Sequence, residues 1–567
     1  MTRFPFRATI PHLDCVTPLN DAADRIKLAH LRGNKQAMER RAQVQHCFLL
    51  AILIYCASTV ACGGTGQSVS FGNAAILQSI AKTQNPLVAQ YTVATDCPGQ
   101  AMVEFGPDMS YGRTTGWNAL PGIYGQTNIL VAGMRASTTY HMRSQIQCAS
   151  GATEVSSDIT FATGPLPALP FPTLTVTRPS PSATSPENPG IEMITIFAAG
   201  IPAYFTDRDA HPIWYYDVGK TNSPYMFKFL PNGHIILMLS EFSGPTSTLI
   251  RELDLAGNTV RELSAAALGG EMQAAGFDFV PQNYTHDLVP LANGHLLVIT
   301  NFSKSFTNLP GYPGTIGVVG DGIIDLDQNW NPVWAWNSFD YLDVNRHLNG
   351  LPDWTHANAL VYTPDGNLLL SMRHQSWVLK IDYNNGGGAG DILWKLGYQG
   401  DFTLTQAGIP TDDPSLWFSF QHFPSLISQT GSQTSLAIWD NGDNRPLDAN
   451  GTLCGAAPAF TACYSRATVF QLDESTSPPT ADLAWANAPG YYGTWGGSIN
   501  QLTNTNVEFD ANALLVPPGP TIASEVQEVT QSSTPQTVWK LDISPATATA
   551  YRAYRVPSLY PGITWAY

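Results

Sequence analysis

Short apolar stretches separated by turn residues recur along the chain, and they predict strands rather than helices. The clearest example runs from Ala359 to Ser371, where two alternating apolar strands flank a turn at Pro364 to Gly366. A Pro-Asp-Gly turn between two such strands is typical of a β-hairpin. Long amphipathic helical patterns are scarce after about residue 70. The pattern therefore indicates an all-β protein.

From about residue 191 onward, one strand-turn-strand unit recurs. In each copy an apolar strand ends in Asp, a turn with Gly, Asn or Pro follows, and a second strand begins with a β-branched residue or Trp. A second hairpin type alternates with this unit, for example at residues 230–239 and 291–300. Two hairpins per repeat make a four-stranded blade, so we expect a six-bladed β-propeller over residues 191–567. The six aspartates are Asp207, Asp254, Asp325, Asp382, Asp473 and Asp542.

Two further regions precede the repeats. Residues 68–164 hold short strands at the spacing of a small immunoglobulin/fibronectin-like β-sandwich, which would serve as a spacer or support. Residues 165–190 are rich in proline and predict an extended linker.

The amino terminus has the features of a targeting segment. An arginine pair precedes a 15-residue apolar run, Cys47 to Ala61, which is too short to span a bilayer comfortably. We therefore expect residues 1–62 to be a signal peptide and the protein to be exported, as a periplasmic protein or a membrane-anchored bacterial lipoprotein. The run ends in a sequence that resembles a lipoprotein cleavage box, so lipidation of Cys62 and simple cleavage nearby are both open. The start codon is Met1 or Met38.

The composition excludes several classes of protein. With 567 residues and 44% hydrophobic residues, the chain can bury a large core and is not disordered throughout. The net charge of −16 becomes about −20 once residues 1–61 are removed. A strongly acidic protein is a poor partner for nucleic acid.

Four cysteines remain beyond the signal segment, in an export context that permits disulfides. Among the three connectivities we choose the local pairs, Cys97 with Cys148 and Cys454 with Cys463. Neither pair has the CxxC spacing of a zinc site, so we expect no metal.

Histidines precede the inner hairpins of three predicted blades. They are His286, His356 and His422, and Arg373 ends the hairpin that follows His356. A lone histidine is usually structural, but three in one register favour a role in chemistry near the channel. His374 would face away from them if its strand is regular.

The segment DWTHANALVYTPDGNLLLSMRHQSWVLKID, with THDLVPLANGHLLVIT, FQHFPSL and IWDNGDNR, resembles the bacterial aryl-sulfate sulfotransferase (arylsulfotransferase) family over most of residues 190–567. The resemblance implies a six-bladed propeller that moves a sulfuryl group between phenols through a sulfated histidine, without nucleotide-activated sulfate. It implies no cofactor, an aryl sulfate donor and a phenolic acceptor as partners, and it allows a homodimer.

By motif, the resemblance assigns His422 as the nucleophile, with His356, Arg373 and His286 as the other catalytic residues. Where the family pattern has a histidine pair, this chain has Thr285-His286, which leaves the identity or role of that first histidine open.

The chemistry agrees with this assignment. By analogy with phosphoryl transfer, sulfuryl transfer needs a nucleophile, a cation and a proton donor for the leaving phenol. Arg373 would hold the sulfuryl oxygens, and His356 or His286 would exchange the proton. Further candidates for substrate contact are Asn358, Asn441, Arg445 and Trp354. Their alternative roles are hydrogen bonding at turns and strand ends and, for Trp354, core packing.

Two alternative functions remain open at this point. The same histidines could activate water in a sulfate or phosphate ester hydrolase. The protein could also be a surface-displayed binding propeller without catalysis, although the three histidines and Arg373 would then lack an explanation. A quinone-dependent dehydrogenase is disfavoured because the repeat lacks its tryptophan docking motif.

Overall fold

The described part of the chain lies within one compact unit, Ala74–Tyr567. The predicted signal peptide, the lipidation site Cys62 and the choice of start codon fall outside the described residues. None of the described helices is both long and apolar enough to cross a bilayer. The computed structural model describes residues 76–179, 186–241, 248–448, 450, 452–454, 463–515, 524–545 and 547–566.

Strands dominate the fold, which confirms the predicted all-β class. Near the amino end they form two antiparallel sheets whose inner faces share one hydrophobic core. The disulfide Cys97–Cys148 lies here, as predicted. The first sheet contains β1 (Leu77–Lys82), β2 (Ala89–Ala94) and β6 (Gln126–Val131). The second contains β3 (Gly99–Gly106), β4 (Arg113–Thr114), β5 (Asn118–Leu120), β7 (Thr139–Cys148), β8 (Thr153–Val155) and β9 (Ile159–Ala162).

Six larger sheets follow, here numbered in chain order. Sheet 1 contains β11 (Ile191–Ile196), β12 (Ala203–Thr206), β13 (Pro212–Tyr216) and β38 (Ala550–Val556). Sheet 2 contains β14 (Asn222–Phe229), β15 (Ile235–Glu241), β16 (Thr248–Leu253) and β17 (Thr259–Ser264). Sheet 3 contains β18 (Asn283–Pro290), β19 (Leu296–Leu309), β20 (Tyr312–Leu326) and β21 (Pro332–Asn337).

Sheet 4 contains β22 (Ala357–Tyr362), β23 (Leu368–Met372), β24 (Trp377–Ile381) and β25 (Ile392–Leu396). Sheet 5 contains β26 (Thr403–Gln406), β27 (Ile409–Pro410), β28 (His422–Thr430), β29 (Gln433–Asp440), β30 (Arg466–Asp473) and β31 (Thr480–Asn487). Sheet 6 contains β10 (Thr173–Thr177), β33 (Ser498–Gln501), β34 (Val507–Ala511), β36 (Ser524–Val529) and β37 (Thr537–Ser544).

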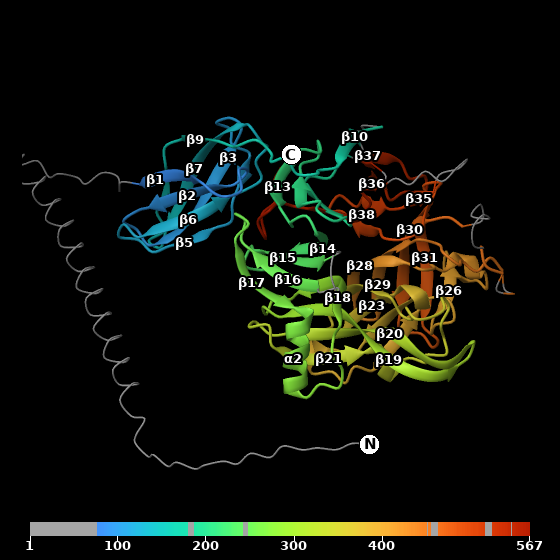
Figure 1. The fold of residues 1–567 in the computed structure, drawn as a ribbon. Coiled ribbons are helices and arrows are strands. Elements are labelled where there is room, and N and C mark those ends of the chain that lie inside the picture. Colours follow the sequence, from blue (N-terminus) through green and yellow to red (C-terminus); the bar gives the residue numbers. More distant parts are fainter. Residues whose placement is uncertain are drawn as a thin grey trace, which may run out of the picture. The chain divides into compact units, whose positions relative to one another are not determined.

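Smaller elements lie between the sheets. Helix α2 (Ala265–Ala275) is capped at its amino end by Ser264, whose side chain accepts a hydrogen bond from Ala267 N. The helix lies beside β17 and β21 (Figure 1). The others are α3 (Ser338–Tyr341), the 3₁₀ turns η1 (Arg373–Gln375), η2 (Asn384–Gly386) and η3 (Pro414–Leu416), and the strand pair β32 (Tyr492–Gly493) and β35 (Leu514–Leu515).

The predicted hairpin around Pro364 is confirmed as β22 and β23, and five of the six Asp-turn units form hairpins. The sixth, at Asp542, does not. Strand β37 pairs with β36 and β10, whereas β38 pairs with β11 at the start of the repeats. The last strand thus closes the chain of sheets against the first, and β10, from the segment predicted to be a linker, takes the free edge of β37.

Each sheet packs face to face against the next one, and hydrophobic clusters fill the six gaps between neighbouring sheets. The cluster between sheets 1 and 2 is continuous with the core of the two amino-end sheets. A middle strand therefore has no solvated face, and the five residues of β23 are all buried. This explains the nearly continuous apolar runs in the sequence, since strands covered on both sides do not alternate.

One strand from each sheet contacts the corresponding strand of the next. Strands β14 and β18 meet, then β18 and β22, β22 and β28, and β28 and β33. Strand β33 in turn meets β38, which is hydrogen-bonded to β11, and β11 contacts β14. These innermost strands form a closed circuit, and the predicted site residues lie on or beside them.

Candidate active site

Aromatic and imidazole rings from five of the six sheets gather at one end of the innermost strands. The rings of His286 on β18 and His356, directly before β22, have centroids 4.6 Å apart. Tyr225 on β14 lies 5.2 Å from His286, and its hydroxyl is 3.1 Å from His286 Nε2. His422, the first residue of β28, lies 6.3 Å from Tyr551 on β38. The structure therefore brings the three predicted histidines together, with two tyrosines that the sequence did not indicate.

The backbone turns these side chains into the cluster. His286 and His356 have φ of 55° and 49°, in the left-handed region that residues other than glycine seldom adopt. The register of strand pairing shifts beside each of them. On β28 the left-handed residue is Phe423, with φ of 44°, rather than His422. The three histidines lie at one end of the sheets. His286 and His356 are themselves the left-handed residues, whereas His422 directly precedes the left-handed residue of its strand.

The surroundings of His422 determine which ring nitrogen is free to react. Its Nδ1 lies 2.7 Å from the Oδ1 of Asn441. The amide nitrogen of Asn441 donates to the carbonyl oxygens of Gly493 and Gly496, so Oδ1 is the acceptor and Nδ1 carries the hydrogen. The backbone N–H of Gly496 donates to Nε2 over 3.3 Å. The lone pair of His422 is therefore on Nε2.

Burial keeps both His422 and His286 uncharged. Only 2% of His422 and 9% of His286 is exposed. Burial, followed by the charge of Arg373, lowers the pKa of His422 well below 6.5. Burial and the neighbouring His356 lower the pKa of His286 in the same way. A neutral imidazole with an unprotonated nitrogen is the form that can act as a nucleophile or base.

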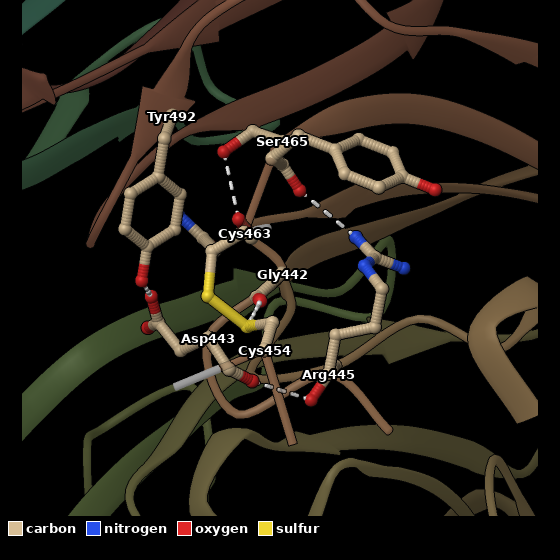
Figure 2. The surroundings of a disulfide bond; sticks show 10 residues. Gly442, Asp443, Arg445, Cys454, Cys463, Ser465 and Tyr492 are labelled. Atoms are coloured by element: carbon tan, nitrogen blue, oxygen red, sulfur yellow. Dashed lines mark hydrogen bonds between the residues drawn. A yellow bond between two sulfur atoms is a disulfide. The ribbon is translucent and has the colours of Figure 1, made fainter. Parts of the chain in front are cut away.

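Arg373 provides the cation beside the cluster. It begins η1, and its guanidinium donates to His374 Nε2 at 2.7 Å, to Asp443 Oδ2 at 2.7 Å and to the carbonyl oxygen of Thr494 at 3.1 Å. Figure 2 shows the other oxygen of Asp443 accepting a hydrogen bond from Tyr492. Burial raises the pKa of Asp443 to about 6. The guanidinium is held at three points, and its direction is fixed.

The predicted disulfide Cys454–Cys463 is confirmed and lies next to this arrangement (Figure 2). The two cysteines pack against Tyr492 in a small buried cluster. The disulfide thereby supports the ring whose hydroxyl contacts Asp443.

His356 and His374 are linked through Asp353. The carboxylate of Asp353 lies 2.6 Å from His356 Nδ1, and the backbone oxygen of Asp353 lies 2.8 Å from His374 Nδ1. The two imidazole rings are 4.5 Å apart. We expected His374 to face away, but β23 ends at Met372 and η1 turns His374 toward the cluster. The prediction was wrong because a 3₁₀ turn does not alternate as a strand does.

Asp353, His356 and His374 offer ligand atoms within 4.8 Å of one another, as a metal site would. Both ring nitrogens of His374 and the Nδ1 of His356 are, however, engaged in hydrogen bonds, and Arg373 donates directly to His374. A guanidinium at this distance opposes a second cation. The group is better suited to contact an anion.

Several buried polar atoms of the cluster have no hydrogen-bond partner among the described residues. They include His286 Nδ1, Arg373 Nε and the hydroxyl of Tyr551. Unpaired buried polar groups are costly, and a bound ligand, ion or water is one way to satisfy them. Arg373 Nε and the Tyr551 hydroxyl are donors suited to an oxyanion, and His286 Nδ1 is one in the tautomer that carries its hydrogen there.

The other predicted contact residues differ in position. Asn441 orients His422, as described, and Asn358 is buried and donates to the backbone oxygen of Gln421. Arg445 pairs with Asp440 at 2.8 Å and donates to backbone oxygens, away from the histidines. Trp354 stacks on Phe339 and is 1% exposed. For Arg445 and Trp354 these contacts agree with the structural alternatives considered above.

Comparison with known proteins gives one informative match. A protein-family model described as Arylsulfotransferase (ASST) matches residues 190–555. None of the curated proteins matches the chain.

Solved structures give weak likenesses. A protein of unknown function from Bacteroides caccae is 10% identical, with 64% of this chain and 98% of that chain covered and a TM-score of 0.37. A protein of unknown function from Dyadobacter fermentans is 10% identical, with 66% and 90% covered and a TM-score of 0.34. A Synechocystis apocarotenoid oxygenase mutant is 10% identical, with 86% and 97% covered and a TM-score of 0.30. Likenesses this weak carry no argument about function.

Proposed function

The chain belongs to the arylsulfotransferase family, and from that premise we propose that it moves a sulfuryl group from a phenolic sulfate ester to a phenolic acceptor. The transfer has two steps and passes through a sulfated His422, without nucleotide-activated sulfate and without a cofactor. The small-molecule donor and acceptor are its partners, and it has no nucleic-acid partner.

The proposal includes the architecture. The six sheets are the blades of a six-bladed propeller, residues 191–567, and the two sheets near the amino end are an immunoglobulin/fibronectin-like sandwich. The closed circuit of innermost strands supports this reading. Export, a lipid anchor at Cys62 and a homodimer stay predictions from the sequence and the family.

The first step forms a bond between His422 Nε2 and sulfur and breaks the bond between sulfur and the phenolic oxygen. Two observations support His422 as the nucleophile. Asn441 holds the hydrogen on Nδ1, and burial lowers the pKa of His422 so that Nε2 stays unprotonated. An incoming phenol then attacks sulfur, and His422 is released unchanged.

Arg373 is the residue best suited to hold the sulfuryl oxygens. Its Nε is buried and has no hydrogen-bond partner among the described residues, while its other nitrogens are anchored by Asp443, His374 and Thr494. An anchored guanidinium with one free donor can bind an anionic group without further reorganisation.

His356 is our choice for the proton donor to the departing phenoxide. Asp353 accepts from its Nδ1, so a proton gained on Nε2 is stabilised by an adjacent carboxylate. In the second step the same nitrogen takes the proton from the incoming phenol. His286 and the Tyr551 hydroxyl, whose buried polar atoms are unpaired among the described residues, contact the transferred group or the phenols.

The single observation that carries the proposal is the convergence of a Nε2 lone pair, a free guanidinium donor and unpaired polar atoms in one buried cluster. The direct test uses the purified full chain with 4-nitrophenyl sulfate, with and without added phenol. We expect acceptor-dependent release of 4-nitrophenol, loss of release in His422→Ala, and a sulfated His422 peptide when the acceptor is omitted.

His211→Ala is the matched control, since this histidine is exposed and lies outside the cluster. It should retain full activity. Equal release without phenol would instead favour a sulfate ester hydrolase, which uses water as acceptor. Binding of aryl sulfates without release in the wild type would favour a binding propeller.

A further inference from the structure

Arg552 lies beneath the cluster that holds the three histidines. It follows Tyr551 on β38 and is completely buried. Its guanidinium donates to the backbone oxygen of Asn358, lies 3.4 Å from the carboxylate of Asp287 and sits 4.7 Å from the ring of Phe423.

Each of those three residues is close in sequence to one of the histidines. Asp287 follows His286, Phe423 follows His422, and Asn358 is two residues beyond His356. One side chain therefore contacts the strand beneath every histidine of the cluster. The ring of Tyr551 lies 5.1 Å from the same guanidinium.

The charge of Arg552 is only partly balanced. Asp287 also binds Lys228, whose ammonium lies 2.7 Å from the other carboxylate oxygen. One carboxylate thus faces two cations. Among the described residues, Nε of Arg552 has no hydrogen-bond partner, and Nη1 has only the 3.4 Å ion pair with Asp287. An excess of buried positive charge is unfavourable unless an anion approaches it.

We propose that Arg552 is the cationic floor of the site, whose excess charge stabilises the anionic sulfuryl group and the phenoxide that its transfer releases. This inference rests on the proposed function. It makes Arg552 a positioning residue that acts on the group above it, whereas Arg373 binds that group from the side.

The charged and titratable groups that surround Arg552 agree with this role. Lys228, whose pKa is lowered by burial, approaches from β14, Asp287 and His286 from β18, and Asp510 from β34. Burial raises the pKa of Asp510 to about 7. Near neutral pH this carboxyl group is therefore only partly ionised, and it balances the positive charge of Arg552 only in part. The charge of Arg552 also contributes to the lowered pKa values of His286 and His422.

The test compares Arg552→Gln with the matched control Arg552→Lys, which loses the guanidinium but keeps the charge. Binding of p-toluenesulfonate, whose sulfonate cannot be transferred, is measured by calorimetry on the full chain. Binding of the neutral phenol p-cresol is measured in parallel.

We expect Arg552→Gln to weaken sulfonate binding by about tenfold or more and Arg552→Lys by less than about threefold, with p-cresol affinity unchanged in both. Equal sulfonate affinity in wild type and Arg552→Gln would overturn the proposal. So would equal losses in the two variants, or equal losses for both ligands, because these outcomes indicate a role in packing.

Lys228→Met keeps the test decisive if Arg552→Gln does not fold. This substitution removes the second cation from Asp287. Sulfonate binding should then fall several-fold, while p-cresol binding stays the same. Unchanged sulfonate binding would overturn the proposal. The outcome is separable from that of the proposed function. A wild type that binds the sulfonate but transfers nothing would refute the transferase and leave the floor intact.

Kinetics provide a second readout once transfer is observed. If Arg552 stabilises the phenoxide, Arg552→Gln should slow transfer from sulfates of weakly acidic phenols more than from 4-nitrophenyl sulfate. An equal decrease for all donors would contradict an electrostatic role.

Discussion

Two buried arginines, three positions apart on β38, have opposite charge environments. Arg552 forms an ion pair with Asp287, which it shares with Lys228. Arg555 is surrounded by three carboxylates from three other strands of sheets 1 and 6. These are Glu192, Glu508 and Glu528.

The difference separates a network that balances its own charge from one that would favour an anionic ligand. Around Arg555 the excess negative charge is relieved internally, because burial and the neighbouring Glu192 raise the pKa of Glu508 well above its usual value. Asn506 and the backbone of Asn188 also donate to Glu528. Around Arg552 the excess is positive, and the nearby histidines are held uncharged by burial. Only the second arrangement favours a ligand of opposite charge.

The largest expected effect is on stability at the Arg555 network. Arg555→Met would leave the carboxylates of Glu192 and Glu528 buried without their cation, and we expect the free energy of unfolding to fall by about 3–5 kcal/mol. Urea denaturation measures this loss. A decrease below about 1 kcal/mol would show that Arg555 does not hold sheets 1 and 6 together, and the comparison would fail.

The histidine end should lose stability in acid. The folded-state pKa values of His422 and His286 lie below 6.5, whereas the unfolded chain takes up these protons near 6.5. Below that pH the unfolded state binds more protons, so the free energy of unfolding falls by about 1.4 kcal/mol per pH unit for each histidine.

His422→Gln should remove one histidine's contribution to the decrease in the free energy of unfolding with falling pH. Urea denaturation between pH 6.5 and pH 5 measures this decrease. For the same reason the wild-type kcat/KM should fall only well below pH 6.5, as His422 becomes protonated. An unchanged stability slope in His422→Gln would contradict a buried neutral imidazole.

The Arg555 network should show the opposite dependence on pH. The folded-state pKa of Glu508 lies above its unfolded value of about 4.5, so the folded state holds the proton longer. Its contribution is complete below about pH 4.5 and is lost as the pH rises toward the folded-state value. Glu508→Gln should therefore flatten this decline and be at least as stable as the wild type at pH 7. A loss of more than about 1 kcal/mol at pH 7 would mean that Glu508 is ionised.

The smallest expected effect concerns the support of Arg373. Tyr492→Phe removes the hydrogen bond to Asp443 but keeps the ring against the disulfide. A single hydrogen bond of this kind corresponds to about a two- to tenfold change. We expect KM for the aryl sulfate to rise within this range while the melting temperature changes little. An unchanged KM would show that Asp443 orients Arg373 without help from Tyr492.

Local sequence was sufficient for much of the fold. Alternating apolar residues and Gly, Asn or Asp at turns predicted the hairpins, because both signals act over a few neighbouring residues. The disulfide pairs could be chosen by proximity along the chain. The residue types His and Arg before and after the inner hairpins indicated the chemistry.

Tyr551, Arg552 and Tyr225 carried no such signal. They join the site because β38 closes against β11 and because β14 and β18 are neighbours, contacts between residues far apart in the chain. The same pairing explains why the sixth Asp-turn unit is not a hairpin.

The sequence by itself therefore determined the strands, the turns, the disulfides and the identity of the candidate catalytic residues, since these depend on local periodicity and residue chemistry. Only the tertiary structure decided that Nε2 of His422 is the unprotonated nitrogen, that η1 turns His374 toward His356, and that Arg552 lies beneath the cluster. Hydrogen-bond direction, burial and charge balance depend on which distant segments pack together, and no local pattern encodes that.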